Sequence, residues 1–113
     1  MAHDEAIAAR IRELLAGDDV TEMKMFGGLA FLVRGNMAVA ASGQGGLLVR
    51  VDPADAPRIV ETSNARFMEM RGREMQGWLR VDAEDIREGP ELSKWVDLGT
   101  TYARALPAKT RSS

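Results

Sequence analysis

Apolar side chains recur at helical spacing near the N-terminus, with charged residues between them. They are Ile7, Ile11, Leu14 and Leu15. This spacing predicts an amphipathic helix from about Asp4 to Ala16, with Asp4 as its N-cap and Gly17 in a left-handed conformation after its end. One face of such a helix is apolar and has to pack against a larger surface.

A longer apolar stripe near the C-terminus predicts a second amphipathic helix. Its members are Leu92, Trp95, Val96, Gly99, Tyr102, Ala103 and Leu106. Pro90 lies near the predicted start, and Pro107 follows the last apolar residue. Glycine inside a helix costs about 1 kcal/mol relative to alanine, so we expect Gly99 to allow a close approach between this helix and a sheet.

Between the two helices the chain changes to short apolar runs separated by turns. A first strand begins at Thr21, and further strands are predicted at 29–33, 37–41, 47–51, 66–70 and 77–81, with turns at 34–36, 42–46 and 71–73. Such short connections make the strands antiparallel, because a parallel pair needs a long crossover. Asp52-Pro53 predicts the start of a short helix through Val60, and Asp82 with Asp85 resembles a capping pair for one helical turn.

The order of these elements predicts an α+β domain of two layers. A central antiparallel sheet of about five or six strands is covered by the N-terminal and C-terminal amphipathic helices. The length of 113 residues fits a single domain, residues 1–113, with an ordered core from about residue 4 to residue 107.

Composition and charge exclude several classes of protein. Apolar residues make up 45% and charged residues 28% of the chain, which is ordinary for a globular domain. No apolar run approaches the roughly 20 residues of a membrane span, and the N-terminus is unlike a signal peptide, so we expect a cytoplasmic protein that does not bind membranes. The net charge of −2 argues against a dedicated nucleic-acid binder but leaves room for a local basic patch. The seven methionines either fill gaps in the core or line an adaptable binding surface.

The residue inventory also limits catalysis. The chain has no cysteine, and its one histidine is His3 near the terminus. Thiolate chemistry is therefore excluded, and neither a histidine-based triad nor a transition-metal site is predicted. Asp52 and Asp55 are attributed to a helix start, and the glycine-rich segment 42–46 to a hairpin turn, since it lacks the Lys-Ser/Thr of a P-loop. We predict no catalytic residue, no metal and no cofactor.

Paired glycines interrupt an apolar strand pattern in the segment 24–28. One interpretation is a β-bulge or a tight bend between strands. The other is a place where a ligand or partner approaches the backbone, with Lys24, Phe26, Gly27 and Gly28 as candidate binding residues.

A second candidate is the turn that carries Arg71 and Arg73. Two arginines beside a glycine and Trp78 could grip a phosphate or carboxylate bidentately. Glu69 and Glu74 flank this turn and could serve as paired carboxylates in acid–base chemistry. Alternatively the turn is a solvated hairpin tip in which these carboxylates pair with the arginines.

Several segments of the chain resemble the N-terminal domain of the TfoX/Sxy family. The most specific is Lys24-Met25-Phe26-Gly27-Gly28-Leu29-Ala30-Phe31, a Met-Phe-Gly-Gly run followed by an apolar strand. Supporting segments are Arg12-Glu13-Leu14-Leu15, Asn36-Met37, Leu47-Leu48-Val49-Arg50-Val51, Trp95-Val96 and Tyr102-Ala103. The resemblance covers roughly residues 4–107.

The resemblance implies an α+β domain with a central antiparallel sheet. It also implies a link to natural competence, the regulated expression of bacterial DNA-uptake genes. Family members that act in competence usually carry a second, C-terminal helical domain, so the resemblance implies a stand-alone copy of the N-terminal domain. The family has no established catalytic residues, and none are transferred.

Three hypotheses for the function follow. The favoured one is a non-enzymatic regulatory or interaction domain that acts through a protein partner. The second is a nucleic-acid-binding accessory protein, in which a basic strip lies along one side of the sheet. The strip would contain Lys24, Arg50, Arg71, Arg73 and Arg80. The third is a small-ligand binder or enzyme with an arginine–carboxylate site. Both a monomer and a homodimer paired through an edge strand stay open.

Overall fold

The computed structural model describes residues 5–15, 20–25, 27–43, 45–70, 72–87 and 89–107. Along the chain the elements are α1 (Glu5–Leu14), β1 (Val20–Met25), β2 (Gly28–Val33), β3 (Asn36–Ala41), β4 (Leu47–Arg50), α2 (Ala56–Thr62), β5 (Arg66–Met70), β6 (Arg73–Val81), the 3₁₀ turn η1 (Ala83–Ile86) and α3 (Gly89–Ala105). The described strands form one sheet in the order β1-β2-β3-β4-β6-β5, and every neighbouring pair is antiparallel. This confirms the predicted α+β class.

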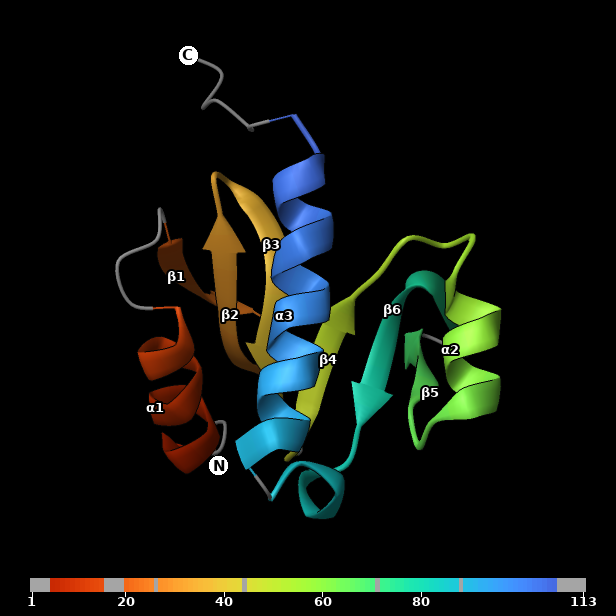
Figure 1. Cartoon of the computed structure of the whole chain (residues 1–113), viewed down its shortest axis with the longest axis horizontal. Helices are drawn as coiled ribbons and strands as arrows, with labels where there is room; N and C mark the ends of the chain where they lie inside the picture. The colour runs from red at the N-terminus through yellow and green to blue at the C-terminus, as the bar shows by residue number, and fades with distance from the viewer. Residues whose placement is uncertain are drawn as a thin grey trace.

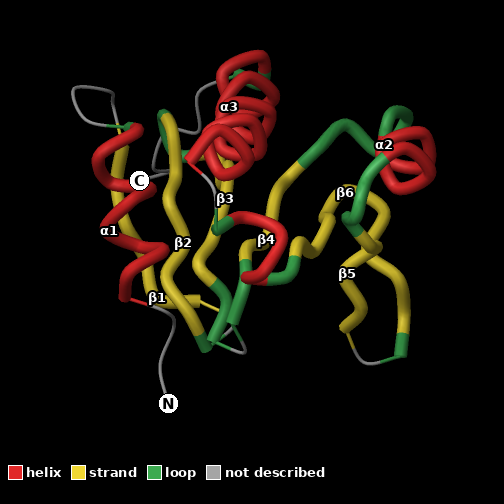
Figure 2. The backbone as a smooth tube through the Cα atoms, turned by 60° about the horizontal axis from the view of Figure 1, so that its bottom comes forward, coloured by secondary structure: helices red, strands yellow, loops and turns green. Residues whose placement is uncertain are grey.

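The described helices lie on the same face of the sheet, which we call the helix face. Figures 1 and 2 show α1 and α3 over the strands from β1 to β4, with α2 standing apart beside β5 and β6. One hydrophobic cluster joins the apolar stripes of the helices to this face. Its centre includes Ile11 of α1, Phe31 of β2 and Leu92 of α3, each at most 1% exposed. Burial of these side chains is the main force that holds helices and sheet together.

A smaller cluster lies on the opposite side of the sheet, which we call the open face. Its members are Ala30, Leu32, Met37, Ala40, Leu48, Met68, Met75 and Trp78. None of the described helices contributes to this cluster, yet Leu48 is only 2% exposed. Met23 shares this face because it pairs with Ala30, and it is 45% exposed. The methionines of the open face therefore both fill a core and reach the surface.

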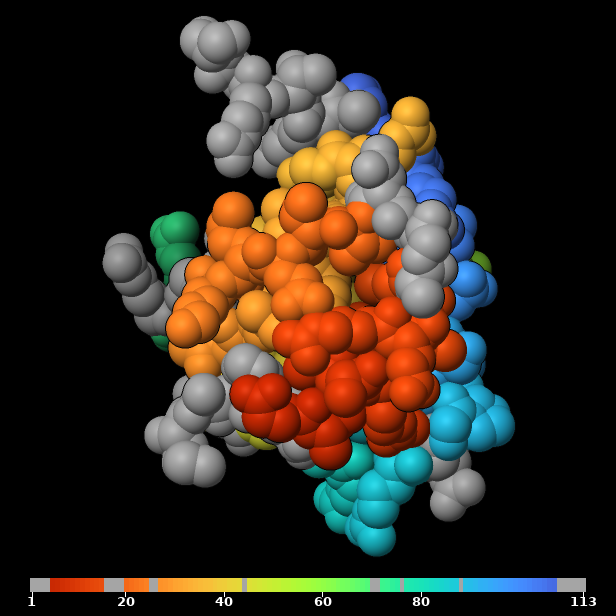
Figure 3. All heavy atoms as spheres, turned by 90° about the vertical axis from the view of Figure 1, so that its left-hand side faces the viewer, coloured from red at the N-terminus to blue at the C-terminus, as the bar shows by residue number. Residues whose placement is uncertain are grey.

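The hairpin of β5 and β6 gives the open face its shape. In Figure 3 the green segment of this hairpin projects on the side of the molecule away from α3. The pairing of β5 and β6 has an irregularity between Phe67 and Met68, and Met68 then pairs with Met75. Such an irregularity bends a strand pair locally. As a result the hairpin brings Met68 and Met75 into the open-face cluster.

The prediction that Gly99 allows close packing is confirmed. A Cβ atom at Gly99 would lie 2.5 Å from the carbonyl oxygen of Ala38 and 2.9 Å from Cγ1 of Val39. The register of β2 and β3 shifts beside Ala38, so a bulge of the sheet lies directly under α3. Only a residue without a side chain lets the helix come this close.

An ion pair fastens α1 to the edge strand β1. Arg12 donates hydrogen bonds from Nε and Nη2 to the two carboxylate oxygens of Glu22, at 2.7 and 3.0 Å. This hydrogen bonding raises the pKa of Arg12 above its ordinary value. The predicted cap residues of this helix, Asp4 and Gly17, lie outside the described residues.

Three details of the sequence prediction are wrong. The second helix begins at Ala56, because Asp52 first forms a turn in which its carbonyl accepts from the N–H groups of Asp55 and Ala56. The last strand begins at Arg73 and not at Gly77. Asp82 does not cap the 3₁₀ turn with its side chain, because its carboxylate accepts a 2.6 Å hydrogen bond from Arg66.

Candidate functional site

The described residues of the two segments predicted as candidate sites lie at different places in the sheet. Gly28 contacts the end of β3, and the strand register places that end of the sheet beside Val81, the last residue of β6. Arg73 is the first residue of the same strand, eight positions before Val81. The strands β3 and β4 also lie between β2 and β6. The structure therefore keeps two separate candidates and does not join them into one site.

The paired glycines form a tight bend between strands, as one interpretation predicted. Met25 pairs with Gly28, so residues 26 and 27 connect β1 to β2, and Gly27 has a φ of 75°. A Cβ atom on Gly28 would clash with the carbonyl oxygen of Ala41, and one on Gly43 would clash with that of Gly27. The close backbone approach at this pair is thus made by the chain's own β3–β4 turn.

Arg80 fastens that β3–β4 turn from the neighbouring strand β6. Its Nη1 donates to Ser42 Oγ at 3.1 Å, and its Nη2 donates to the carbonyl of Gly45 at 2.8 Å. The amide of Gly45 also donates to the carbonyl of Ser42 at 3.1 Å. These contacts support the prediction that the glycine-rich segment 42–46 is a hairpin turn.

The basic strip expected for nucleic-acid binding is not formed by the described residues. Lys24 pairs with Leu29 on the helix face, whereas Arg80 pairs with Leu48 on the open face. The guanidinium of Arg50 lies 5.7 Å from the centre of the Tyr102 ring on α3. These cations point to different surfaces, so they do not make one track for phosphates.

The described part of the arginine turn has two carboxylates beside it. Glu69 and Glu74 are exposed and lie directly opposite each other on β5 and β6. Two like charges in that arrangement repel. Gly72 has a φ of 79° in the turn, and Trp78 lies on the open face. Arg71 and Phe26 lie outside the described residues, and the candidate binding residues stay predictions.

A groove between α2 and α3 joins separate parts of the fold. It consists of two adjoining cavities of about 380 and 420 Å³. Both cavities are lined by Thr62, Ser63, Lys94 and Trp95. The first is mainly polar and adds Glu61, Asn64, Asp85 and Glu91; the second is mainly apolar and adds Ile59, Asp97, Leu98 and Thr101. We call these two cavities together the α2–α3 groove.

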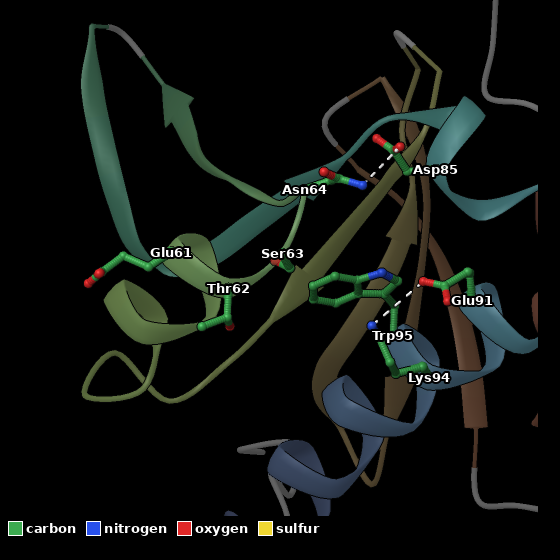
Figure 4. A pocket seen from close by; sticks show the side chains of 8 residues that line it. All are labelled: Glu61, Thr62, Ser63, Asn64, Asp85, Glu91, Lys94 and Trp95. Carbon is green, nitrogen blue, oxygen red and sulfur yellow. Dashed lines mark hydrogen bonds and ion pairs between the residues drawn. The ribbon is translucent and has the colours of Figure 1, made fainter.

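Short polar contacts fix the walls of this groove. Ser63 Oγ donates to the carbonyl of Ile59 at 2.6 Å and closes the end of α2. The Asn64 side chain donates to Asp85 Oδ1 at 3.2 Å, which links the α2–β5 connection to η1. Figure 4 shows the indole of Trp95 next to Ser63 and on the side that faces Asn64 and Asp85. The α2–α3 groove is thus built on anchored segments of the chain.

Within the α2–α3 groove, the ammonium group of Lys94 lies over the indole ring of Trp95. Lys94 Nζ lies 5.2 Å from the centre of the Trp95 ring and 3.6 Å from Glu91 Oε1. An ammonium group over an indole face and beside a carboxylate is held by both attractions. The groove also contains the carboxylates of Glu61, Asp85 and Asp97, so its carboxylates outnumber its single lysine. Its chemistry suits a cationic ligand with an apolar part.

Sequence reasoning missed this groove because its residues come from three distant segments. Asn64 lies 21 positions before Asp85, which lies 10 positions before Trp95, and no motif connects them. Trp95 was assigned to the core stripe of the C-terminal helix, and at 3% exposed it does belong to the core. The one local signal was a lysine next to a tryptophan inside a helix.

Two further observations concern other kinds of site. Within the described ranges, no group of three histidine, aspartate or glutamate side chains comes together in a way that could hold a metal ion. No helix in the described part of the chain is long and apolar enough to cross a membrane.

The fold and groove define a class of protein: a two-layer α+β domain in which the described residues form a six-stranded antiparallel sheet with helices on one face and a groove between two of them. The family model of the TfoX N-terminal domain matches residues 13–103, most of the chain. The chain therefore belongs to the TfoX N-terminal domain family. Comparison with curated proteins and with solved structures gave no significant match.

Proposed function

We propose that this chain is a non-enzymatic, cytoplasmic regulatory domain that acts by binding a segment of a protein partner in the α2–α3 groove. The observation that carries the proposal is that a polar and an apolar cavity adjoin along α3. From Glu91 to Thr101 the groove follows ten residues of α3, about 15 Å at 1.5 Å per residue. An extended segment of four or five residues has this length.

Membership of the TfoX N-terminal domain family supports a regulatory role. The resemblance to competence regulators gives the regulation of DNA-uptake genes as the context of that role. The sequence adds support, because a chain without cysteine and with a single histidine at position 3 has no thiolate nucleophile and no internal histidine for a catalytic triad. Partner binding in the groove needs none of those residues.

Site-specific photocrosslinking in cells of the source organism tests the proposal. A photoreactive benzoylphenylalanine at Thr101 places the reactive group on an exposed residue of the groove wall. We expect a discrete protein adduct from this position. The control is the same group at Glu13, an exposed residue of α1 outside the groove.

The captured protein is then purified, and its affinity for the unmodified domain is measured. The proposal requires saturable binding that Leu98→Asp, a change in the apolar half of the groove, weakens at least tenfold without unfolding the domain. It fails if Thr101 and Glu13 give the same adducts, or if purified partner binds the wild type and the Leu98→Asp variant equally.

A further inference from the structure

We propose that the α2–α3 groove recognises a basic, partly apolar segment of the partner, whose lysine or arginine takes the position that Lys94 now occupies over Trp95. This inference rests on the proposed function and adds the chemistry of the partner. It is carried by three features of the groove: a cation held at the indole, a buried hydrogen-bond donor, and an excess of carboxylates.

The contacts of Lys94 show that an ammonium group fits this place. Its Nζ lies 5.2 Å from the Trp95 ring centre and 3.6 Å from Glu91 Oε1, as Figure 4 shows for the ion pair. The Lys94 side chain is 59% exposed, so it can leave at little cost. A cation from a partner finds the same ring and the same carboxylate once Lys94 has moved.

The indole nitrogen supplies a second, independent indication of a ligand. Trp95 is 3% exposed, and its Nε1–H has no hydrogen-bond acceptor among the described residues. In Figure 4 the nitrogen lies on the edge of the ring that is turned toward Asn64 and Asp85, within the polar cavity. Buried tryptophan N–H groups usually find a partner, because an unpaired one costs free energy. A main-chain carbonyl of a bound segment provides that acceptor.

Charge selects the class of side chain on this segment. Asp85, Glu91 and Asp97 line the groove along η1 and α3, while Glu61 extends away from the indole in Figure 4. A lysine or arginine reaches the polar cavity, and the apolar cavity beside Leu98 accepts a neighbouring apolar side chain. An acidic segment or a phosphate backbone is repelled by the same carboxylates.

Fluorescence anisotropy with labelled synthetic peptides tests this inference on the full chain. The probe is an end-blocked six-residue peptide of alternating arginine and leucine, and its match carries glutamate at each arginine. We expect the arginine peptide to bind at least tenfold more tightly at low salt and to lose affinity as salt rises.

Variants then separate the groove from general charge attraction. Lys94→Ala removes the competing cation, and we expect about threefold to tenfold tighter binding of the arginine peptide. Asp85→Asn and Glu91→Gln each remove one carboxylate and weaken binding by a similar factor. Glu84→Gln removes an exposed carboxylate next to Asp85 but outside the groove, and it leaves the affinity unchanged.

The hydrogen bond of the indole is tested by Trp95→Phe, which keeps a ring and removes the donor. We expect weaker peptide binding with a folded protein, as judged by circular dichroism. Equal affinity for the arginine and glutamate peptides, or weaker binding by Lys94→Ala, overturns the inference. The proposed function is tested separately by crosslinking at Thr101 and by Leu98→Asp. If the peptide tests fail but Thr101 still captures a partner whose binding Leu98→Asp weakens, the groove binds a partner of different chemistry and the proposed function stands.

Discussion

Gly99 lies where α3 crosses the bulge in β3. Because glycine has no side chain, the helix can pack closely against the sheet at this point. A Cβ atom there would lie 2.5 Å from a backbone oxygen, which cannot rotate away as a side chain can. The helix has to shift instead, and the shift opens the packing of Leu92 and Val96, which precede Gly99 in the same helix.

Gly99→Ala is therefore expected to destabilise the protein by about 1–3 kcal/mol, although alanine favours helices by about 1 kcal/mol. Urea unfolding measures the change. Gly89→Ala in the same helix is the control, because a Cβ atom there meets nothing within 4 Å, and it should stay within about 0.5 kcal/mol of wild type. Equal stability of the Gly99→Ala variant and wild type would contradict the close contact.

At the scale of elements, the β1–β2 bend and the β3–β4 turn are packed backbone against backbone. Gly28 and Gly43 each face a carbonyl of the other turn. Arg80 adds two hydrogen bonds from β6 to the second turn. Two strand connections and the end of β6 thus act as one unit, and a change in one of them affects the others.

Gly28→Ala should destabilise this end strongly, by about 2 kcal/mol or more, because backbone atoms of Ala41 and Gly43 occupy the space for the new methyl group. Gly27→Ala tests the backbone conformation alone, since its φ is 75° but no atom lies within 4 Å. It should cost about 1–2 kcal/mol. Thermal unfolding of both variants measures the difference, and the order Gly27→Ala worse than Gly28→Ala would refute this packing.

Arg80→Lys should loosen the β3–β4 turn, because a single ammonium cannot reproduce the forked contacts to Ser42 and Gly45. We expect a loss of about 1 kcal/mol and faster amide hydrogen exchange at Gly45. Arg87→Lys at an exposed position is the control and should leave both quantities unchanged. Unchanged exchange at Gly45 in Arg80→Lys would show that the turn holds without the arginine.

At the scale of the whole molecule, one sheet carries a core on each side. The helix face is covered by helices, whereas the open face is covered by its own methionines and Trp78. Leu47 and Leu48 are neighbours on β4, and they belong to the two different cores with exposures of 0% and 2%. Both sides therefore contribute to the stability of a single folding unit.

Leu48→Ala should cost about 2–5 kcal/mol, as much as Leu47→Ala on the helix face. Urea unfolding followed by circular dichroism and by tryptophan fluorescence measures this loss, and both probes should give one transition. Met23→Ala on the exposed edge of the open face is the control and should change stability by less than about 0.5 kcal/mol. A negligible effect of Leu48→Ala would mean that the open face is only a loose surface.

The sequence by itself determined the elements and the class of fold. Periods of about 3.6 and the alternation of short apolar runs with turns depend on neighbours along the chain, so α1, α3 and most strands could be read directly. The start of α2 was wrong because a local turn at Asp52 precedes the helix. The start of β6 was wrong because the strand extends along β5 from Arg73 before it pairs with β4. The Gly99 contact was predictable because a glycine in an apolar helical stripe needs a packing reason.

Only the tertiary structure decided what the glycine turns contact and where a groove forms. Gly28 could face a ligand or another turn, and the distance to Gly43 is set by the pairing of β2 with β3. The groove forms because α2 and α3 lie apart on the same face of the sheet. Ser63, Asp85 and Trp95, which come from three segments of the chain, all line it. Local pattern fixes which side of each element is apolar; the order of the strands in space fixes which polar residues become neighbours at the surface.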